Sequence, residues 1–283
     1  MKIGKFQIDL IDTCIFALDG GAMFGVIPKT LWTKAYNQGD EFNRIPLSSR
    51  PLLVRWENKT VLVDAGIGIK LSEKWQKIYN VDNSKSIPEK IIEPFGLKPE
   101  DITDVILTHL HFDHAGGATT ILNNEIIPSF PNAKYYVQKE QYNWGLNPSE
   151  KDRASYFNEN YVPLHSMGLL DLLDGDGSIF PGIETISVYG HTKAMQLIKI
   201  SNGGSTALFC ADLFPTKAHI PIPFVMGYDN EPLSTIKEKK KMLPQAYEEN
   251  WTLIYEHDAF TQASKLINDE KGFRAGEVVV VNE

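Results

Sequence analysis

The sequence predicts an α/β protein on the basis of three features of its 283 residues. Short apolar stretches typical of buried strands recur along the chain, each ending in a turn or a loop. Helical patterns fall between them, and strands interleaved with helices favour an α/β fold. Several apolar stretches also end in a histidine or an aspartate. These residue types are unfavourable in a core, so they predict that separate strand ends supply side chains to one site.

The first half of the chain supplies three of the predicted strands. KTVLVDAGIG at residues 59–68 is an apolar strand followed by glycines. DVILTHLHFDHAGG at residues 104–117 is a second strand, which ends in a Gly-Gly turn. AKYYVQKEQYNW at residues 133–144 predicts a strand that turns into a helix.

The second half supplies four more strands and the clearest helix. We expect the strands at residues 182–192, 195–201, 205–214 and 250–258. PLSTIKEKKKMLPQAYEE, at residues 232–249, has a helical pattern in which Pro244 is expected to end or kink the helix. Its lysine run, residues 237–241, is expected to form the solvated face of that helix.

Composition limits the classes of partner and the cell compartment. Acidic residues outnumber basic ones by 36 to 28, which argues against a nucleic-acid partner. Asp9 and Asp12 interrupt the apolar N-terminal stretch, so we expect no signal peptide. No apolar run approaches the roughly 20 residues that cross a bilayer, so we expect no membrane association. Cys14 and Cys210 make no disulfide framework, and a cytoplasmic location is the expectation.

The stretch LTHLHFDHAGG places three of the seven histidines and one aspartate within six residues. On an extended chain, residues two apart lie on the same face about 6.6 Å apart, so His109 and His111 can reach one metal ion. Asp113 and His114 are adjacent and cannot both point with that pair, which places them to serve a second ion. A cluster of surface histidines is the alternative, but the spacing ahead of a Gly-Gly turn favours a paired metal site.

The same residues resemble a known family. THLHFDHAGG resembles the signature of the metallo-β-lactamase superfamily, whose members are mostly dinuclear metal hydrolases. VDAG at residues 63–66, the GHT histidine His191, Asp212 after an apolar strand and the late His257 match in the family's order. The resemblance implies a four-layer αβ/βα sandwich. It also implies one domain over residues 1–283, with two halves that meet near residues 165–180 and a site at the edge between them.

The resemblance also implies roles for individual residues. The first ion would be held by His109, His111 and His191, and the second by Asp113, His114 and His257. Asp212 would bridge the ions. Asp64 would orient a ligand imidazole, although a simple turn cap explains that residue nearly as well. Zinc is the first expectation for both divalent ions, and iron, manganese or cobalt also suit nitrogen and oxygen ligands.

A site of this kind favours hydrolysis. The charge of two divalent ions exceeds that of Asp113, Asp212 and a bridging hydroxide together, so the site stays positive and stabilises an anionic transition state. Water on such an ion ionises near pH ~7, which supplies the nucleophile. Asp113 would hold the hydroxide and pass a proton to the leaving group.

The substrate is predicted from the apolar segments. DGGAMFGVIPKTLW at residues 19–32 resembles the early segment of the quorum-quenching lactonases of this superfamily, which open N-acyl homoserine lactones. Packing against an edge of the first sheet explains this segment equally well. With PIPFVMGY at residues 221–228, it gives the predicted pocket residues Met23, Phe24, Ile27, His219 and Phe224.

Two departures from the family pattern concern the pocket. The best-known lactonases have a tyrosine three residues after the bridging aspartate, where this chain has Pro215; Tyr189 or Tyr228 is a candidate replacement. The GHT segment continues as KAMQ, without the second histidine of the family, which is not a metal ligand.

Other functions stay open at this point. The alternatives are a phosphotriester (organophosphate) hydrolase, a thioester hydrolase similar to glyoxalase II, and a non-catalytic binding protein with a decayed site. The segment at residues 144–168, rich in aromatic residues, is expected to cover the pocket or to form a homodimer contact.

Overall fold

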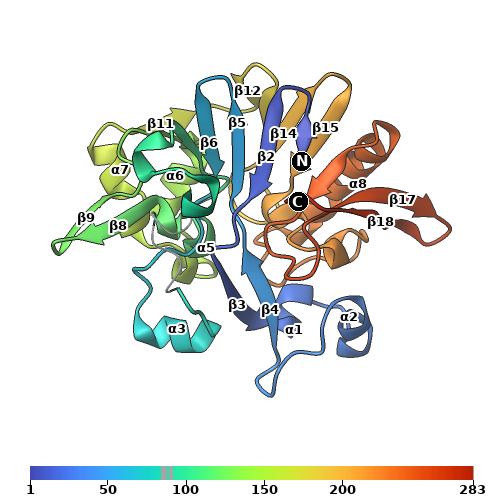
Figure 1. The fold of residues 1–283 in the computed structure, drawn as a ribbon. Coiled ribbons are helices and arrows are strands. Elements are labelled where there is room, and N and C mark those ends of the chain that lie inside the picture. The colour runs from blue at the N-terminus through green and yellow to red at the C-terminus, as the bar shows by residue number, and fades with distance from the viewer. Residues whose placement is uncertain (84–87, 89–91, 283) are drawn as a thin grey trace.

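The computed structural model describes residues 1–83, 88 and 92–282. Two large sheets pack face to face at the centre of the molecule (Figure 1). Helices α6 (Lys139–Leu146) and α7 (Val162–Ser166) cover the outer face of one sheet, and α8 (Pro232–Glu248) covers the other. This arrangement confirms the predicted four-layer αβ/βα sandwich.

The first sheet takes its strands from the N-terminal half of the chain. Its order is β1-β2-β5-β6-β7-β10-β11, and the strands from β6 to β11 run parallel. Their bounds are Lys2–Ile3, Phe6–Leu10, Leu52–Trp56, Lys59–Val63, Asp104–Ile106, Lys134–Gln138 and Leu170–Leu173. The three strands predicted in this half are β6, β7 and β10, and β10 leads into α6 as expected.

Three residues separate the end of β11 from the start of the second sheet. Its order follows the chain from β12 to β18, antiparallel except for the β15–β16 pair. The bounds are Gly177–Phe180, Ile183–Val188, Met195–Asn202, Ser205–Phe209, Thr252–Ile254, Ala263–Asp269 and Gly272–Val279. The four strands predicted here are β13 to β16.

Apolar side chains of both sheets form the central core. Leu52 and Val54 of β5 belong to the same buried cluster as Ile198 of β14 and Phe209 of β15. Their removal from water supplies the main driving force for this packing, at roughly 25 cal/mol per Å². The site lies at one edge of this core.

Helix α8 differs from the sequence prediction at two residues. The helix continues through Pro244 to Glu248, so the proline does not end it. Pro244 has no backbone N–H, so it removes the helical hydrogen bond to the carbonyl of residue 240 without ending the helix. Within the predicted solvated lysine run, Lys239 is fully buried. Its Nζ donates hydrogen bonds to the carbonyl oxygens of His219, Pro221 and Phe224, which supply the partners that a buried ammonium needs.

Two small hairpins extend from the sandwich. Strands β3 (Cys14–Asp19) and β4 (Arg44–Ser49), with helices α1 (Gly20–Phe24) and α2 (Lys29–Ala35), form an extension next to α3 (Glu73–Tyr79) (Figure 1). Strands β8 (Thr119–Leu122) and β9 (Glu125–Pro128) form the other hairpin. Within the described ranges, no helix has the length and apolarity that a bilayer span requires.

Candidate metal centre

The strand ends of both sheets converge on one edge of the sandwich. His109 and His111 follow β7, and the short helix α5 (Phe112–Ala115) carries Asp113 and His114. His191 follows β13, Asp212 lies just after β15, and His257 follows β16. The seven side chains predicted to bind metal therefore come from four strand ends and lie together.

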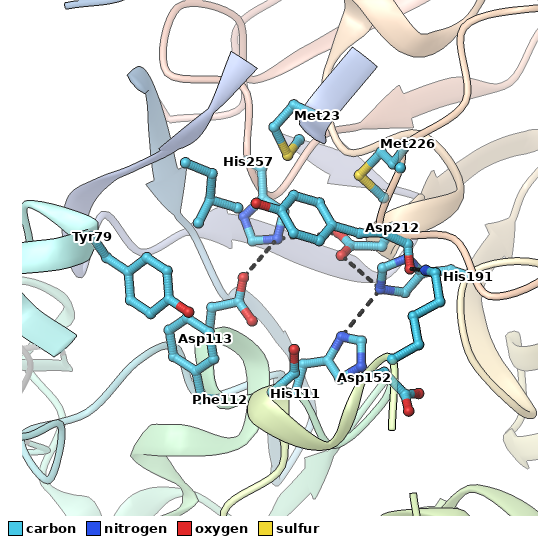
Figure 2. A pocket seen from close by; sticks show the side chains of 15 residues that line it. Met23, Tyr79, His111, Phe112, Asp113, Asp152, His191, Asp212, Met226 and His257 are labelled. Atoms are coloured by element: carbon cyan, nitrogen blue, oxygen red, sulfur yellow. Dashed lines mark hydrogen bonds and ion pairs between the residues drawn. The ribbon is translucent and has the colours of Figure 1, made fainter. Parts of the chain in front are cut away.

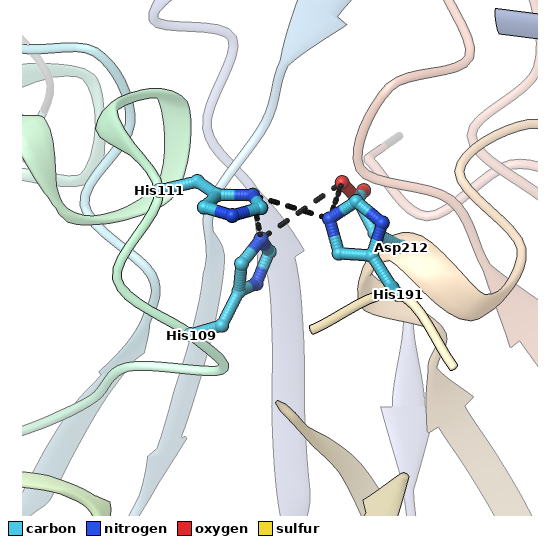
Figure 3. Close-up of side chains that lie close together, drawn as sticks. All are labelled: His109, His111, His191 and Asp212. Carbon is cyan, nitrogen blue, oxygen red and sulfur yellow. Dashed lines mark hydrogen bonds and ion pairs between the residues drawn. The ribbon is translucent and has the colours of Figure 1, made fainter. Parts of the chain in front are cut away.

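Four of these side chains form a first group. Figure 3 shows His109, His111 and His191 pointing toward one another and toward Asp212. Nδ1 of His111 lies 3.1 Å from Nε2 of both His109 and His191. Oδ2 of Asp212 lies 3.1 Å from Nε2 of His191. Buried ring nitrogens aimed at one point are an arrangement that suits a cation.

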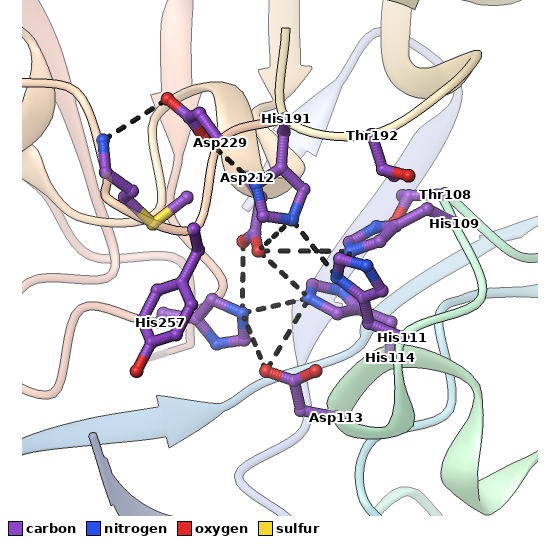
Figure 4. A network of polar contacts seen from close by, with 12 residues as sticks. Thr108, His109, His111, Asp113, His114, His191, Thr192, Asp212, Asp229 and His257 are labelled. Carbon is purple, nitrogen blue, oxygen red and sulfur yellow. Dashed lines mark hydrogen bonds and ion pairs between the residues drawn. The ribbon is translucent and has the colours of Figure 1, made fainter. Parts of the chain in front are cut away.

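The other three side chains form a second group beside the first (Figure 4). Nε2 of His257 lies 3.0 Å from Nε2 of His114 and 3.7 Å from Oδ2 of Asp113. Asp212 lies between the groups, because its Oδ1 is 3.1 Å from Nε2 of His257 and its Oδ2 faces His191. Within the described residues, that buried Oδ1 has no hydrogen-bond partner, as expected of an oxygen that binds a cation.

The outer nitrogens of four imidazoles have acceptors that fix the ring orientation. In each ring the outer nitrogen is Nδ1. Nδ1 of His109 lies 3.0 Å from Thr108 Oγ1, and Nδ1 of His114 lies 3.1 Å from Asp64 Oδ2. Nδ1 of His191 lies 3.1 Å from Asp229 Oδ1, and Nδ1 of His257 lies 2.8 Å from the Ser48 carbonyl oxygen. A proton held on each Nδ1 leaves the lone pair of Nε2 free to face the centre. The donor set therefore fits two divalent ions.

Burial and charge set the protonation of the centre. Burial lowers the pKa of His109 and His111 well below the ordinary value, which keeps both rings neutral as metal ligands must be. Burial raises the pKa of Asp212, but the imidazoles of His257, His114 and His191 outweigh it and hold that pKa well below the usual range. Against burial, the Asp212 and Asp229 carboxylates raise the pKa of His191 to about 9. The carboxylates at this point favour positive charge, which a bound ion would supply.

Asp64 has both contacts that its sequence position suggests. Its fully buried carboxylate accepts hydrogen bonds from the backbone N–H and the hydroxyl of Thr108, both at 2.7 Å, which fixes the turn before His109. Its Oδ2 also lies 3.1 Å from Nδ1 of His114.

Sequence reasoning missed three carboxylate or carbonyl partners of the histidines. Asp229 contacts His191, the Ser48 carbonyl contacts His257, and Oε2 of Glu256 lies 2.9 Å from Nδ1 of His114. Of these three partners, only Glu256 could have been predicted from the sequence, because it is an acidic residue directly before a strand-end histidine. The other two lie far along the chain from the rings that they contact.

A cavity of about 160 Å³ lies over the centre. Figure 2 shows Met23 and Met226 on one side of the cavity and Phe112 and His111 on the other. The lining residues outside the metal groups are Leu18, Met23, Tyr79, Phe112, Lys151, Asp152, Ser155, Met226, Gly227 and Tyr228.

Of the predicted pocket residues, Met23 lines this cavity. Phe24, Ile27, His219 and Phe224 are absent from its described lining. Phe24 lies behind the wall, where it stacks on His219 at 4.6 Å between ring centroids and meets Phe224 edge-on. Burial lowers the pKa of His219 to about 4, so this ring is neutral and packs as an aromatic residue.

Lys151 was missed by sequence reasoning. It lines the cavity, and its Nζ donates 2.9 Å hydrogen bonds to the carbonyl oxygens of Tyr228 and Asp229. The Lys151 ammonium is therefore already hydrogen-bonded to backbone carbonyls of the cavity wall. Tyr228 lines the cavity, whereas Tyr189 is 41% exposed and does not belong to the described lining.

Comparisons with known proteins agree with the geometry. Residues 45–252 match the profile of the Metallo-beta-lactamase superfamily. The chain is 31% identical over 157 residues to an N-acyl homoserine lactonase of Bacillus sp, and 30% identical over 186 residues to one of Bacillus cereus. These alignments cover 54% and 64% of this chain, and 56% and 63% of the relatives, which is less than two thirds of their length.

Solved structures match over nearly the whole chain. A probable metal-dependent hydrolase from Staphylococcus aureus has a TM-score of 0.88 and 32% identity, covering 99% of this chain and 100% of that one. AidC, a dizinc quorum-quenching lactonase, has a TM-score of 0.83 and 19% identity over 100% of this chain and 97% of its own. The second likeness shows the fold alone. Because the family profile spans most of the chain and the clustered histidines and aspartates lie at the strand ends of that fold, the protein belongs to the metallo-β-lactamase superfamily.

Proposed function

We propose that the protein is a dinuclear metal-dependent hydrolase that opens a lactone ring of the N-acyl homoserine lactone type. The observation that carries this proposal is the meeting of two ligand groups at Asp212, beneath a cavity whose other walls include Leu18, Met23, Phe112 and Met226. The curated relatives named N-acyl homoserine lactonase support the substrate class.

The ligand assignment follows the two groups. His109, His111 and His191 would hold one ion, Asp113, His114 and His257 the other, and Asp212 both. Zinc suits this set best, and iron, manganese or cobalt suit it as well. When bound, such ions polarise a carbonyl oxygen and lower the pKa of water to about 7.

The protein's own side chains would handle the proton and the substrate. Asp113 lines the cavity and its Oδ2 lies 3.7 Å from Nε2 of His257, so its carboxylate can accept the proton of the attacking water. The same carboxylate can return that proton to the ring oxygen that leaves.

The size of the cavity favours a small cyclic head group. Its volume is close to the roughly 150 Å³ of a protein cavity that holds benzene. A second hollow of about 710 Å³ adjoins it and shares Leu18, Tyr79 and Tyr228 with it. A lactone ring would fill the first space, and an acyl chain would extend into the second.

The lining of the smaller cavity argues against a glutathione thioester, which carries carboxylates. Lys151 is the one lysine or arginine in the described lining of that cavity, and two carbonyl oxygens already accept hydrogen bonds from it; Arg44 and Lys77 line the outer hollow. A glutathione carboxylate would need free cationic donors to replace its hydration, whereas a phosphotriester is uncharged and is distinguished by the substrate panel. The complete set of ligands argues against a non-catalytic binding protein.

A panel of substrates tests the proposal. We expect the purified, metal-loaded enzyme to open butanoyl, hexanoyl, octanoyl and decanoyl homoserine lactones, with kcat/KM rising by up to about fourfold per CH₂ until the pocket is full, from ~0.8 kcal/mol per buried CH₂. Proton release and a product one water heavier are the measurements. Cleavage of a phosphotriester or glutathione thioester without any lactone activity would contradict the substrate class and leave the hydrolase class intact.

Of the two candidates for the tyrosine missing at Pro215, Tyr228 lines the cavity, so it is the one that would contact the substrate carbonyl. We expect Tyr228→Phe to lower kcat/KM by about 10-fold or more, the loss of roughly one hydrogen bond of 1.5 kcal/mol. Tyr189→Phe is the matched control, because Tyr189 lies outside the described cavity lining. Equal kcat/KM for wild type and Tyr228→Phe would remove Tyr228 from the proposed site.

A further inference from the structure

A second buried cluster lies behind the metal groups. Asp64, His114 and Glu256 each place one nitrogen or oxygen within 4.8 Å of the others, and all three side chains have 0% exposure. Two carboxylates therefore converge on one ring nitrogen. Nδ1 of His114 lies 3.1 Å from Oδ2 of Asp64 and 2.9 Å from Oε2 of Glu256.

The two carboxylates differ in their other contacts. Asp64 accepts hydrogen bonds from the N–H and the hydroxyl of Thr108, so it has a structural role that does not depend on His114. Glu256 has no comparable role. Among the described residues, no donor meets either of its carboxylate oxygens with full hydrogen-bond geometry, and His114 is the nearby group that can offset its charge.

A buried carboxylate without a partner is expensive, because its hydration is lost and nothing replaces it. The ring of His114 offers the compensation. Nδ1 faces Glu256, and Nε2 on the opposite side of the ring faces His257 at 3.0 Å and Asp212 at 3.6 Å. The imidazole thus connects the Glu256 carboxylate to the place where the second group would hold an ion.

We propose that Glu256 is a positioning residue of the second metal site. Its carboxylate lies 2.9 Å from Nδ1 of His114, beside the Asp64 carboxylate that accepts the N–H there, and it favours the tautomer that directs the Nε2 lone pair at the ion. It also balances the charge of that ion from behind the ring. This inference rests on the dinuclear site of the proposed function.

Metal binding tests the inference without any substrate. Glu256→Leu removes the acceptor, Glu256→Gln keeps an acceptor oxygen and removes the charge, and Asp229→Asn makes the equivalent change behind His191. Chelator competition with Zn²⁺ gives two dissociation constants for each protein. Anomalous diffraction from crystals grown at limiting Zn²⁺ shows which position has lost its ion.

We expect Glu256→Leu to weaken the ion beside His114 by about 10–100-fold and to leave the ion beside His191 unchanged. Asp229→Asn should show the opposite selectivity. Recovery of affinity in Glu256→Gln would assign the effect to the hydrogen bond, and equal weakening would assign it to the charge; both support the proposal. Thermal unfolding in chelator checks that each variant folds.

Two results would overturn the role of Glu256. One is unchanged affinity for both ions in Glu256→Leu, and the other is equal weakening of both ions. Should Glu256→Leu fail to fold, Glu256→Ala takes its place and is judged by the same two outcomes. Fewer than two Zn²⁺ ions on the wild type would instead contradict the dinuclear site itself.

Discussion

Removing the metal ions with a chelator should abolish hydrolysis, and adding Zn²⁺ back should restore it. The expected loss is more than about 10⁴-fold, because the ions would supply both the activated water and the Lewis acid. No serine or cysteine nucleophile paired with a base is found in the described cavity lining to carry a residual reaction. The imidazole nitrogens of the two metal groups face one another, so these buried side chains have few roles besides binding the ions.

Elemental analysis beside the activity assay makes this prediction specific. We expect two ions per chain in the active enzyme, with Mn²⁺, Co²⁺ and Fe²⁺ tested against Zn²⁺ in the chelated protein. The unrelated divalent ion Ca²⁺ is the control, because it prefers six to eight oxygen ligands. An active, metal-replete enzyme with one ion or fewer would disprove the dinuclear assignment.

Replacing Asp212 with alanine should lower kcat/KM by more than about 10³-fold, beyond the loss expected from a single electrostatic donor. Its Oδ1 faces His257 and its Oδ2 faces His191, so one substitution removes a ligand from both groups. Three buried imidazoles would also lose the carboxylate that lies among them.

Asp64→Asn is the matched comparison for Asp212→Ala. Asp64 contacts His114 only through the outer nitrogen, and such a change typically costs about 10–100-fold. Steady-state kinetics and metal content of the two variants give the answer. Small and similar losses in both would show that Asp212 does not bridge two ions.

Local patterns predicted the α/β class and the polar residues at the strand ends, whereas the four-layer sandwich and the two metal groups were implied by the family resemblance. The strand-end histidines stand directly after apolar runs, so a strand assignment also places His191 and His257 at an edge of the sandwich. The position of Asp212 follows from β15 in the same way.

The cavity wall was predicted less completely, because it depends on contacts between distant segments. Lys151 reaches the cavity from a loop and is held by carbonyl oxygens some 77 and 78 residues away. Phe24 and His219 were predicted pocket residues, but their stacking places them behind Met23. Lys239 lies in a lysine run that suggests exposure, and the three carbonyl oxygens that keep it buried belong to a loop without a sequence signal.

The division of the ligands between the two sheets has a mechanical consequence. His109, His111, Asp113 and His114 follow a strand of the first sheet, whereas His191, Asp212 and His257 follow strands of the second. Each ion would therefore take ligands from both halves of the sandwich and act as a cross-link between them. Free energy of ion binding then adds to the free energy of unfolding, as RT ln(1 + [metal]/Kd). The supply of metal would set how firmly the two halves hold together as well as how fast the enzyme turns over.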